Sequence, residues 1–263
     1  MANIKLLIAT HKKASMPSNQ ELYLPIHVGR EGKEDIGYTG DNTGENVSLL
    51  NPYYSELTGL YWAWKNLDVD YLGLVHYRRY FTKKSGSYTE GIKIDDVVLD
   101  QVNVEKLLRE ADIVVPKKRK YYIETIYDHY SHTFDRDHLD KTRNIIENRF
   151  PDYLSSFDTV MKQRSAYMFN MFIMRKELVD EYCSWLFPIL EKLMEQVDYS
   201  EMTPFESRFP GRISERLFNV WLLKNGYLIK EVPFMYLEKV NLLEKGKAFL
   251  QAKFLGKKYG KSF

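Results

Sequence analysis

The sequence predicts an α/β protein with a single domain, in which helices flank a mostly parallel sheet. Short apolar runs of strand length alternate along the chain with segments whose apolar residues recur at helical spacing, which is the pattern of strand–helix–strand units. The chain has 263 residues and shows neither an internal repeat nor a stretch of linker composition. One large domain accommodates a chain of this kind.

The first quarter of the chain supplies a strand, a loop and a helix. Residues 4–10 form an apolar run that ends in a polar turn, and we expect the first buried strand there. Residues 29–48 are rich in Gly, Asp, Asn and Thr, which are loop residues. A helix is expected over residues 51–66, with Asn51 as its N-cap and Pro52 at its first helical position.

Two further strands follow, and then a segment without clear periodicity. Residues 71–75 are apolar, and so are residues 111–116, which a helical pattern at 104–110 precedes. We therefore expect two more parallel strands. The segment 117–138 is rich in Tyr, His and charge, which predicts a long functional excursion outside the regular structure.

The second half of the chain completes the α/β pattern. Residues 166–174 predict another apolar strand, and residues 177–197 predict a long amphipathic helix that Pro188 interrupts. A helix at about 214–224 and a strand at 228–232 are expected to close the sheet.

We place the end of the α/β domain, residues 1–243, before a basic amphipathic tail at residues 244–263. The tail has six lysines with apolar residues between them, and no acidic residue follows Glu244. This pattern is typical of segments that lie on an anionic membrane surface. A terminal helix that packs on the domain with its lysines in water explains the pattern equally well.

Composition excludes several classes of protein. The 38 basic and 36 acidic residues nearly cancel, whereas nucleic-acid-coating proteins are strongly basic, so we expect no nucleic-acid partner. No apolar run is long enough to span a membrane, and the single cysteine, Cys183, favours a reducing, cytoplasmic compartment. Tyr, Phe and Trp reach 14% of the residues, which suits either an aromatic core or walls that hold sugars and bases.

The residues after the strand at 71–75 are the strongest functional candidates, because ligands bind at the carboxyl ends of parallel strands. They are His76, Tyr77, Arg78 and Arg79. Strand alternation places His76 and Arg78 on one side of the chain, and Tyr77 and Arg79 on the other. Two guanidiniums and an imidazole in one region match a diphosphate. The alternative is a pair of surface arginines that neighbouring acids neutralise.

Three pairs of residues could in principle hold a metal. They are Asp68 with Asp70, Asp95 with Asp96, and His129 with His132. The first pair resembles the Asp-x-Asp of sugar-nucleotide enzymes but stands at the start of its strand, the wrong edge of the sheet. The second suits a helix start or a loop, and the third lacks further ligands and suits acceptor contacts or the surface. We therefore expect no metal ligand and no cofactor, with Mn²⁺ or Mg²⁺ as the alternative.

Glu215 is the carboxylate that needs an explanation, because it flanks the apolar face of a predicted helix near its N-terminus. It is either a first-turn charge that the helix dipole stabilises, or a general base that faces the crevice with a pKa tuned by partial burial. The sequence leaves both interpretations open.

Several stretches together resemble a bacterial family of capsule and exopolysaccharide glycosyltransferases, long catalogued as a domain of unknown function. The resemblance lies in GDNTGEN (40–46), NPYY (51–54), ELT (56–58), YWAW (61–64), GLVHYRRYF (73–81), NMFIM (170–174) and SERLF (214–218). It implies a GT-A-like fold, a UDP-sugar donor and inverting transfer of a hexosyl group to a growing, lipid-linked glycan at the cytoplasmic face of the membrane. Galactofuranosyl transfer from UDP-galactofuranose is the specificity that the resemblance favours.

The leading hypothesis is thus an inverting glycosyltransferase with Glu215 as its base. We expect the nucleotide and its diphosphate to contact Thr10, His11, His76, Arg78 and Arg79. We expect the donor sugar or the acceptor to contact Asp41, Asn42, Glu56, Tyr77 and Asn170. A glycoside hydrolase, which needs two facing carboxylates and no nucleotide, and a non-enzymatic lectin are the competing hypotheses. The clustered arginines disfavour both the hydrolase and the lectin, since neither binds a diphosphate.

Overall fold

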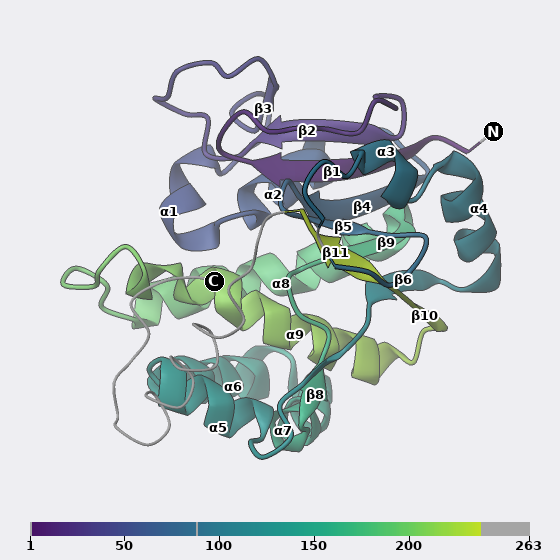
Figure 1. Ribbon diagram of the computed structural model, residues 1–263. Coiled ribbons are helices and arrows are strands. Elements are labelled where there is room, and N and C mark those ends of the chain that lie inside the picture. Colours follow the sequence, from purple (N-terminus) through teal and green to yellow (C-terminus); the bar gives the residue numbers. More distant parts are fainter. Residues whose placement is uncertain (1, 88, 238–263) are drawn as a thin grey trace.

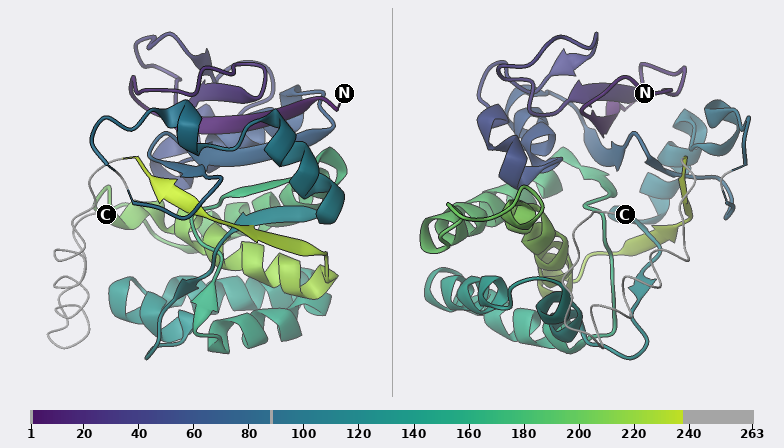
Figure 2. Two further views of the ribbon diagram at one scale, coloured as in Figure 1. Left: turned by 45° about the vertical axis from the view of Figure 1, so that its right-hand side comes forward. Right: turned by 60° about the vertical axis from the view of Figure 1, so that its left-hand side comes forward.

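The computed structural model describes residues 2–87 and 89–237, and these form one α/β domain (Figure 1). Helices cover both faces of a central sheet, and three further helices form an outer layer on one side (Figure 2). The predicted fold class is therefore confirmed. The predicted tail at 244–263 lies outside the described residues.

The described part of the main sheet has nine strands, in the order β10-β6-β9-β4-β1-β2-β3, with β5 attached to β4 and β11 attached to β5. Its strands are β1 (Ile4–Thr10), β2 (Tyr23–His27), β3 (Thr39–Gly40), β4 (Tyr71–His76), β5 (Arg79–Phe81), β6 (Ile113–Pro116), β9 (Phe172–Arg175), β10 (Ile229–Val232) and β11 (Phe234–Tyr236). Strand β1 pairs in parallel with β2 and β4, and β10 pairs in parallel with β6. Strand β9 runs antiparallel between β4 and β6. The sheet is thus largely parallel, as predicted. A separate ribbon pairs β7 (Arg119–Lys120) with β8 (Ser165–Ala166).

Strand β1 shows why a continuous apolar run marks a central strand. Leu7 and Ala9 face the core on the side of the long helices, whereas Leu6 and Ile8 face the second core on the opposite side. Because side chains alternate between the two faces, residues 6–9 of β1, which are buried on both, are all apolar.

The described helices are more numerous than predicted, and those predicted at 104–110 and 214–224 begin earlier in the chain than expected. They are α1 (Asn51–Tyr54), α2 (Leu57–Asn66), α3 (Ile94–Val97), α4 (Gln101–Glu110), α5 (Ile126–Thr133), α6 (Asp137–Arg149), α7 (Leu154–Lys162), α8 (Lys176–Gln196) and α9 (Phe209–Asn225), with short 3₁₀ turns η1 (Ser48–Leu50), η2 (Pro151–Tyr153) and η3 (Glu206–Arg208). Helix α8 continues through Pro188, which was expected to interrupt it. None of the helices in the described ranges is long and apolar enough to cross a membrane.

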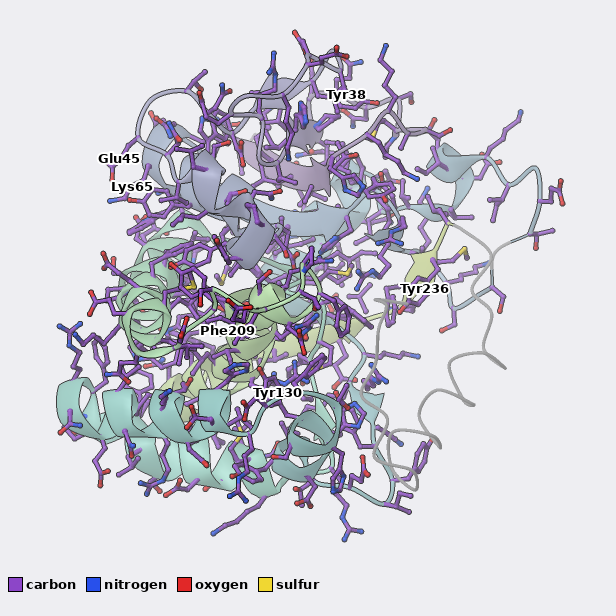
Figure 3. The ribbon with its side chains drawn as sticks, turned by 90° about the vertical axis from the view of Figure 1, so that its left-hand side faces the viewer. Tyr38, Glu45, Lys65, Tyr130, Phe209 and Tyr236 are labelled. Atoms are coloured by element: carbon purple, nitrogen blue, oxygen red, sulfur yellow. The ribbon has the colours of Figure 1, made fainter. Side chains whose placement is uncertain are left out.

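The predicted excursion outside regular structure at 117–138 is only partly right, because this segment includes β7, all of α5 and the start of α6. Helix α5 and the start of α6 occupy this segment, and together with α7 they pack on α8 and α9. Tyr130 and Phe209 lie in the layer between them (Figure 3). The buried positions of α5 do keep helical spacing, but two of the four are His129 and Thr133, which hides the apolar period. A capping box between Thr125 and Asp128 begins the helix.

The predicted helix at 51–66 is two helices. Ser55 separates α1 from α2 and has a left-handed φ of 54°. Asn51 lies inside α1 and does not act as its N-cap; its Nδ2 donates to the carbonyl of Ser55 at 2.8 Å. This bond stabilises the break, which leaves Glu56 at the start of α2.

The predicted strand at 166–174 is also interrupted. Strand β9 begins only at Phe172, because Phe169 and Asn170 adopt left-handed φ values of 78° and 52°. Non-glycine residues seldom take this conformation, and strained backbone of this kind clusters at functional sites.

Candidate active site

The carboxyl ends of β1 and β4 lie side by side, because the two strands are parallel neighbours in register. Ala9 of β1 pairs with His76 of β4. Thr10 at the end of β1 and the residues that follow the two strands, His11 in one case and Tyr77 and Arg78 in the other, therefore share one edge of the sheet. This is the edge at which open α/β sheets bind ligands.

The chain turns back directly after β4, which changes the predicted arrangement of the two arginines. His76 pairs with Arg79 across an antiparallel hairpin, and Tyr77 and Arg78 form its two-residue turn. The expected strand alternation through residues 76–79 is therefore wrong. His76 and Arg79 are cross-strand partners, whereas Arg78 lies at the turn with Tyr77.

A basic cluster surrounds the Tyr77 ring. The His11 ring packs edge-to-face with the Tyr77 ring at a centroid separation of 5.4 Å, and the Lys12 ammonium and the Arg78 guanidinium lie 5.2 Å and 5.3 Å from the Tyr77 centroid. Burial lowers the pKa of His11, and the positive charges of Arg78 and Lys12 lower it further. Basic side chains that lie this close together favour the binding of an anionic ligand.

Lys33 and Arg208 also lower the pKa of His11, although they come from a distant loop and from the start of α9. Positive charge from Lys12, Lys33, Arg78 and Arg208 therefore converges on this edge from four parts of the chain. Thr10 has a structural role beside it. Its buried hydroxyl donates to the carbonyl of Lys12 at 2.6 Å, which fixes the turn that presents His11 and Lys12.

Arg79 belongs to a second group of residues, on the far side of the hairpin. Its guanidinium lies 4.4 Å from the Phe169 ring and 5.7 Å from the ring of Tyr236, its partner in β11. Desolvation lowers the pKa of Arg79, and the charges of Glu56 and Glu215 oppose that shift. Arg79 thus faces two carboxylates, whereas Arg78 faces cations.

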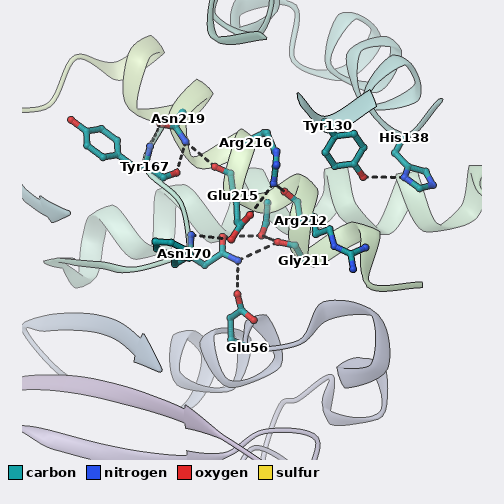
Figure 4. A network of polar contacts seen from close by, with 12 residues as sticks. Glu56, Tyr130, His138, Tyr167, Asn170, Gly211, Arg212, Glu215, Arg216 and Asn219 are labelled. Carbon is teal, nitrogen blue, oxygen red and sulfur yellow. Dashed lines mark hydrogen bonds and ion pairs between the residues drawn. The ribbon is translucent and has the colours of Figure 1, made fainter. Parts of the chain in front are cut away.

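The strained turn at Phe169 and Asn170 holds both carboxylates (Figure 4). The backbone N–H of Phe169 donates to Glu215 Oε1 at 2.9 Å, and Asn170 Nδ2 donates to Glu56 Oε1 at 2.7 Å. Ser214 Oγ donates to Asn170 Oδ1 at 2.9 Å, which fixes the orientation of the amide. A glutamate from α9 and a glutamate from the start of α2 therefore meet at one turn.

Glu215 lies in the second turn of α9, since the helix begins at Phe209 and not near residue 214. The first-turn interpretation of its charge is therefore wrong. Its Oε2 accepts from Arg216 Nη1 at 2.8 Å, and 18% of the side chain is exposed. The carboxylate is thus anchored on both oxygens and still reaches solvent.

Glu56 is held in its ionised form by its neighbours. Burial raises the pKa of Glu56, but the His76 imidazole, 3.6 Å away, and the Asn170 amide outweigh burial and hold it at about 2. Glu56 therefore stays charged at physiological pH. The His76 atom that faces Glu56 Oε1 at 3.6 Å is the buried Nε2, and this separation is longer than a hydrogen bond. A ligand that brings a hydrogen-bonding group would satisfy this nitrogen.

Asp41 and Asn42 lie at the same carboxyl edge of the sheet but further along it. They follow β3, at the end of the sheet opposite β10. The Asp41 carboxylate is fully buried and accepts from the backbone N–H groups of Gly29 and Arg30 and from Ser48 Oγ. Asn42 Nδ2 donates to Glu31. The structure does not bring either residue to Glu215, and Asp41 instead holds the loop in place.

We accordingly expect Asp41→Ala to lower the free energy of unfolding by at least about 2 kcal/mol, because three buried donors lose a charged acceptor. Asn42→Ala, which removes a more exposed contact, should change it by less than about 0.5 kcal/mol. Urea denaturation measures both. If Asp41→Ala is fully stable but loses affinity for UDP-sugar, the carboxylate binds the donor after all.

The predicted metal candidates lie away from this edge. Asp70 precedes β4 and its Oδ2 accepts from the N–H of Asn3, so the pair with Asp68 stands at the amino end of the strand, as expected. Asp95 and Asp96 begin α3, also as expected. His129 and His132 each direct Nδ1 to the buried Glu124 at 3.0 Å. In the ranges that the structure describes, no group of three or more such residues is arranged to hold a metal.

Sequence reasoning missed Lys12, Phe169, Arg216 and Tyr236. Lys12 adjoins His11 in the predicted polar turn, which was a usable signal. Phe169 and Tyr236 are aromatic residues in apolar surroundings, and nothing in their spacing distinguishes them from core residues. Arg216 neighbours Glu215 in a helix, where adjacent residues do not usually interact through their side chains.

Most of this chain is similar to known proteins. The family model described as "Domain of unknown function (DUF4422)" matches residues 5–226. The chain belongs to this family. A solved structure, the apo form of the WbbM bifunctional glycosyltransferase, is 30% identical to this DUF4422 chain with a TM-score of 0.83. The similarity covers 90% of this chain and 46% of that one, so the chain spans less than half the length of WbbM. The expected glycosyltransferase fold is thereby confirmed. A search of curated proteins gives no match.

Proposed function

We propose that this DUF4422 chain is an inverting glycosyltransferase that moves a hexosyl group from a UDP-sugar to a growing glycan. One observation carries the proposal. A basic cluster (His11, Lys12 and Arg78) and a carboxylate pair (Glu56 and Glu215) flank the hairpin at the carboxyl end of β4, in a fold that is that of a solved glycosyltransferase. The first group suits a diphosphate and the second suits the hydroxyls of sugars.

In this proposal an acceptor hydroxyl oxygen attacks the anomeric carbon of the donor from the face opposite the diphosphate. The bond between that carbon and the diphosphate oxygen breaks, and the bonding electrons leave with UDP. Arg78, Lys12 and His11 stabilise the negative charge that develops on the leaving group. Glu215 accepts the proton of the hydroxyl.

Glu56 and Arg79 have a positioning role toward the donor sugar. Glu56 is held by Asn170 and remains ionised, so it is a poor proton acceptor but a strong acceptor of hydrogen bonds from hydroxyls. The contacts that hold the pKa of Glu56 at about 2 make its protonation costly. Glu215 is therefore the better choice of base.

We expect catalysis to survive EDTA, because arginine, lysine and histidine supply the positive charge where Asp-x-Asp enzymes hold a metal. Asp68→Asn combined with Asp70→Asn is the matched control and should leave turnover nearly unchanged, since both residues precede β4 at the opposite edge. Turnover that requires Mn²⁺ or Mg²⁺ and disappears in the double variant would contradict this expectation.

A screen of UDP-sugars tests the function itself. We expect one UDP-hexose to be hydrolysed slowly without acceptor and transferred faster with one, and UDP-galactofuranose is the donor that the sequence resemblance favours. The same resemblance suggests a lipid-linked acceptor at the cytoplasmic face of the membrane. Binding of oligosaccharides without any turnover of UDP-sugars would instead support a lectin.

A further inference from the structure

A run of exposed basic residues leaves the sheet at the edge that carries the candidate active site. Strands β4 and β6 point in the same direction, because β9 runs antiparallel to both. The run begins directly after β6 and therefore at the same carboxyl edge. Its members are Lys117, Lys118, Arg119 and Lys120, and Arg164 adjoins them across the β7–β8 ribbon. All five side chains are exposed, and we call them the basic strip.

Two exposed apolar side chains stand at the end of the basic strip. Tyr122 is 77% exposed and Ile123 is 60% exposed. Tyr122 has a left-handed φ of 57°, which costs energy in a residue other than glycine. Hydrogen bonds hold this turn, since the Ile123 N–H donates to the Tyr121 carbonyl at 2.7 Å and the Tyr121 N–H donates to the Arg164 carbonyl at 2.8 Å. The fold thus presents an aromatic and an aliphatic side chain beside five positive charges.

The basic strip has an excess of positive charge. Two exposed carboxylates flank it, and both accept hydrogen bonds from neighbours. Asp128 Oδ2 accepts from the Thr125 hydroxyl at 2.7 Å, and Glu231 Oε1 accepts from the Tyr167 hydroxyl at 3.0 Å. Two negative charges do not balance five positive ones, so this surface favours an anionic partner.

A buried ring connects the basic strip to the candidate active site. The Arg119 guanidinium lies 5.2 Å from the centroid of Tyr121. Burial raises the pKa of Tyr121, the positive charges of Arg216 and Arg119 oppose this shift, and the negative charge of Glu215 adds to it. Arg119 and Glu215 therefore act on the same ring. The ribbon strand β8, which pairs with β7, lies beside α7 at the end of the domain farthest from β3 (Figure 1).

We propose that the basic strip, together with Tyr122 and Ile123, docks the protein on a membrane whose surface carries anionic lipid headgroups. Such a surface attracts lysine and arginine, and their long side chains can reach one plane from both faces of a narrow ribbon. A tyrosine suits the boundary between headgroups and acyl chains, because its ring is apolar and its hydroxyl is polar. A dissolved polyanion would pair with the charges but leave the two apolar side chains in water. The inference goes beyond the proposed transferase function, and its test needs neither donor nor acceptor.

A fluorescent label on the turn tests the docking directly. The single cysteine, Cys183, is fully buried, so Ile123→Cys can be labelled selectively with a polarity-sensitive fluorophore. We expect its emission to rise with vesicles of phosphatidylcholine that contain about one third phosphatidylglycerol, and to stay constant with pure phosphatidylcholine. Val102→Cys is the matched control, because Val102 is 71% exposed on α4, which precedes β6 at the opposite edge of the sheet. Its emission should stay constant with both kinds of vesicle.

Sedimentation with the same anionic vesicles tests the role of the charges. Lys118→Gln combined with Lys120→Gln should weaken vesicle binding at least about tenfold, and added salt should weaken the binding of the wild type. Both side chains are exposed, so the fold should be unaffected. Lys106→Gln combined with Arg109→Gln, two exposed basic residues on α4, is the matched control and should bind as the wild type does.

Three results would overturn the docking surface. They are constant emission from the label at Ile123→Cys, vesicle binding that survives Lys118→Gln with Lys120→Gln, and tighter binding of polyuridylate than of anionic vesicles. The second result would assign the lipid contact to another part of the chain, such as the basic sequence at 244–263. Calorimetry with UDP separates this inference from the transferase, because UDP affinity should be equal in all these variants. Vesicle binding without UDP binding would keep the docking surface and overturn the transferase.

Discussion

Glu215→Gln lowers the rate of sugar transfer by about 10²- to 10⁴-fold if Glu215 is the base, because glutamine keeps the shape of the side chain but cannot accept the proton. The amide oxygen can still accept from the Phe169 N–H, so the strained turn should persist. UDP affinity should hardly change, since the base contacts the acceptor and not the diphosphate. Transfer rate and UDP affinity, measured on one preparation, check both statements.

Glu110→Gln is the matched control for this substitution. Glu110 is also an ion-paired glutamate, 2.7 Å from Lys230, but it ends α4, away from the two clusters. It should transfer at the wild-type rate. A Glu215→Gln protein with a lowered melting temperature and near-normal turnover per folded molecule would show that the carboxylate is structural.

Arg78→Ala should weaken UDP binding by about 1.5–3 kcal/mol, the usual worth of a hydrogen bond to a charged group, which is roughly 10- to 150-fold in Kd. The fold should not suffer, because Arg78 lies in a hairpin turn, outside β4 and β5. Calorimetric titration with UDP measures the effect, and Arg149→Ala, an exposed arginine in the last turn of α6, is the control.

Arg79→Ala should behave differently from its neighbour. Because Arg79 faces Phe169 and the two carboxylates, we expect it to lower transfer while UDP affinity stays within a few-fold of wild type. Equal losses of UDP affinity in Arg78→Ala and Arg79→Ala would contradict the assignment of Arg78 to the diphosphate and of Arg79 to the carboxylates.

The position of the candidate site at the carboxyl ends of β1 and β4 could be predicted from the sequence. It depends on strands that are buried on both faces, and such strands are visible as apolar runs. The apolar runs of β1 and β4 end at His11 and at Tyr77, so the parallel arrangement alone brings these residues together. Glu56, Asn170 and Glu215 were found through their motifs, and the structure joins all three at one turn.

The arrangement within the site could not be predicted, because local backbone reversals without sequence signals decide it. The hairpin at Tyr77 and Arg78 contains none of the glycine, asparagine or proline residues that mark tight turns. The left-handed turn at Phe169 and Asn170 lies inside an apolar run whose pattern is that of a continuous strand. By contrast, Thr125 and Asp128 form a capping box that the sequence does display, so α5 was open to prediction.

Titration of the wild-type protein with UDP and, separately, with uridine, in the presence of EDTA, tests most directly whether the basic cluster binds a nucleotide diphosphate. We expect saturable binding of UDP that is at least tenfold tighter than that of uridine and that weakens with added salt, because the charges of the diphosphate supply most of the affinity. Equal and weak binding of UDP and uridine by the folded protein would contradict the diphosphate site and, with it, the proposed transferase.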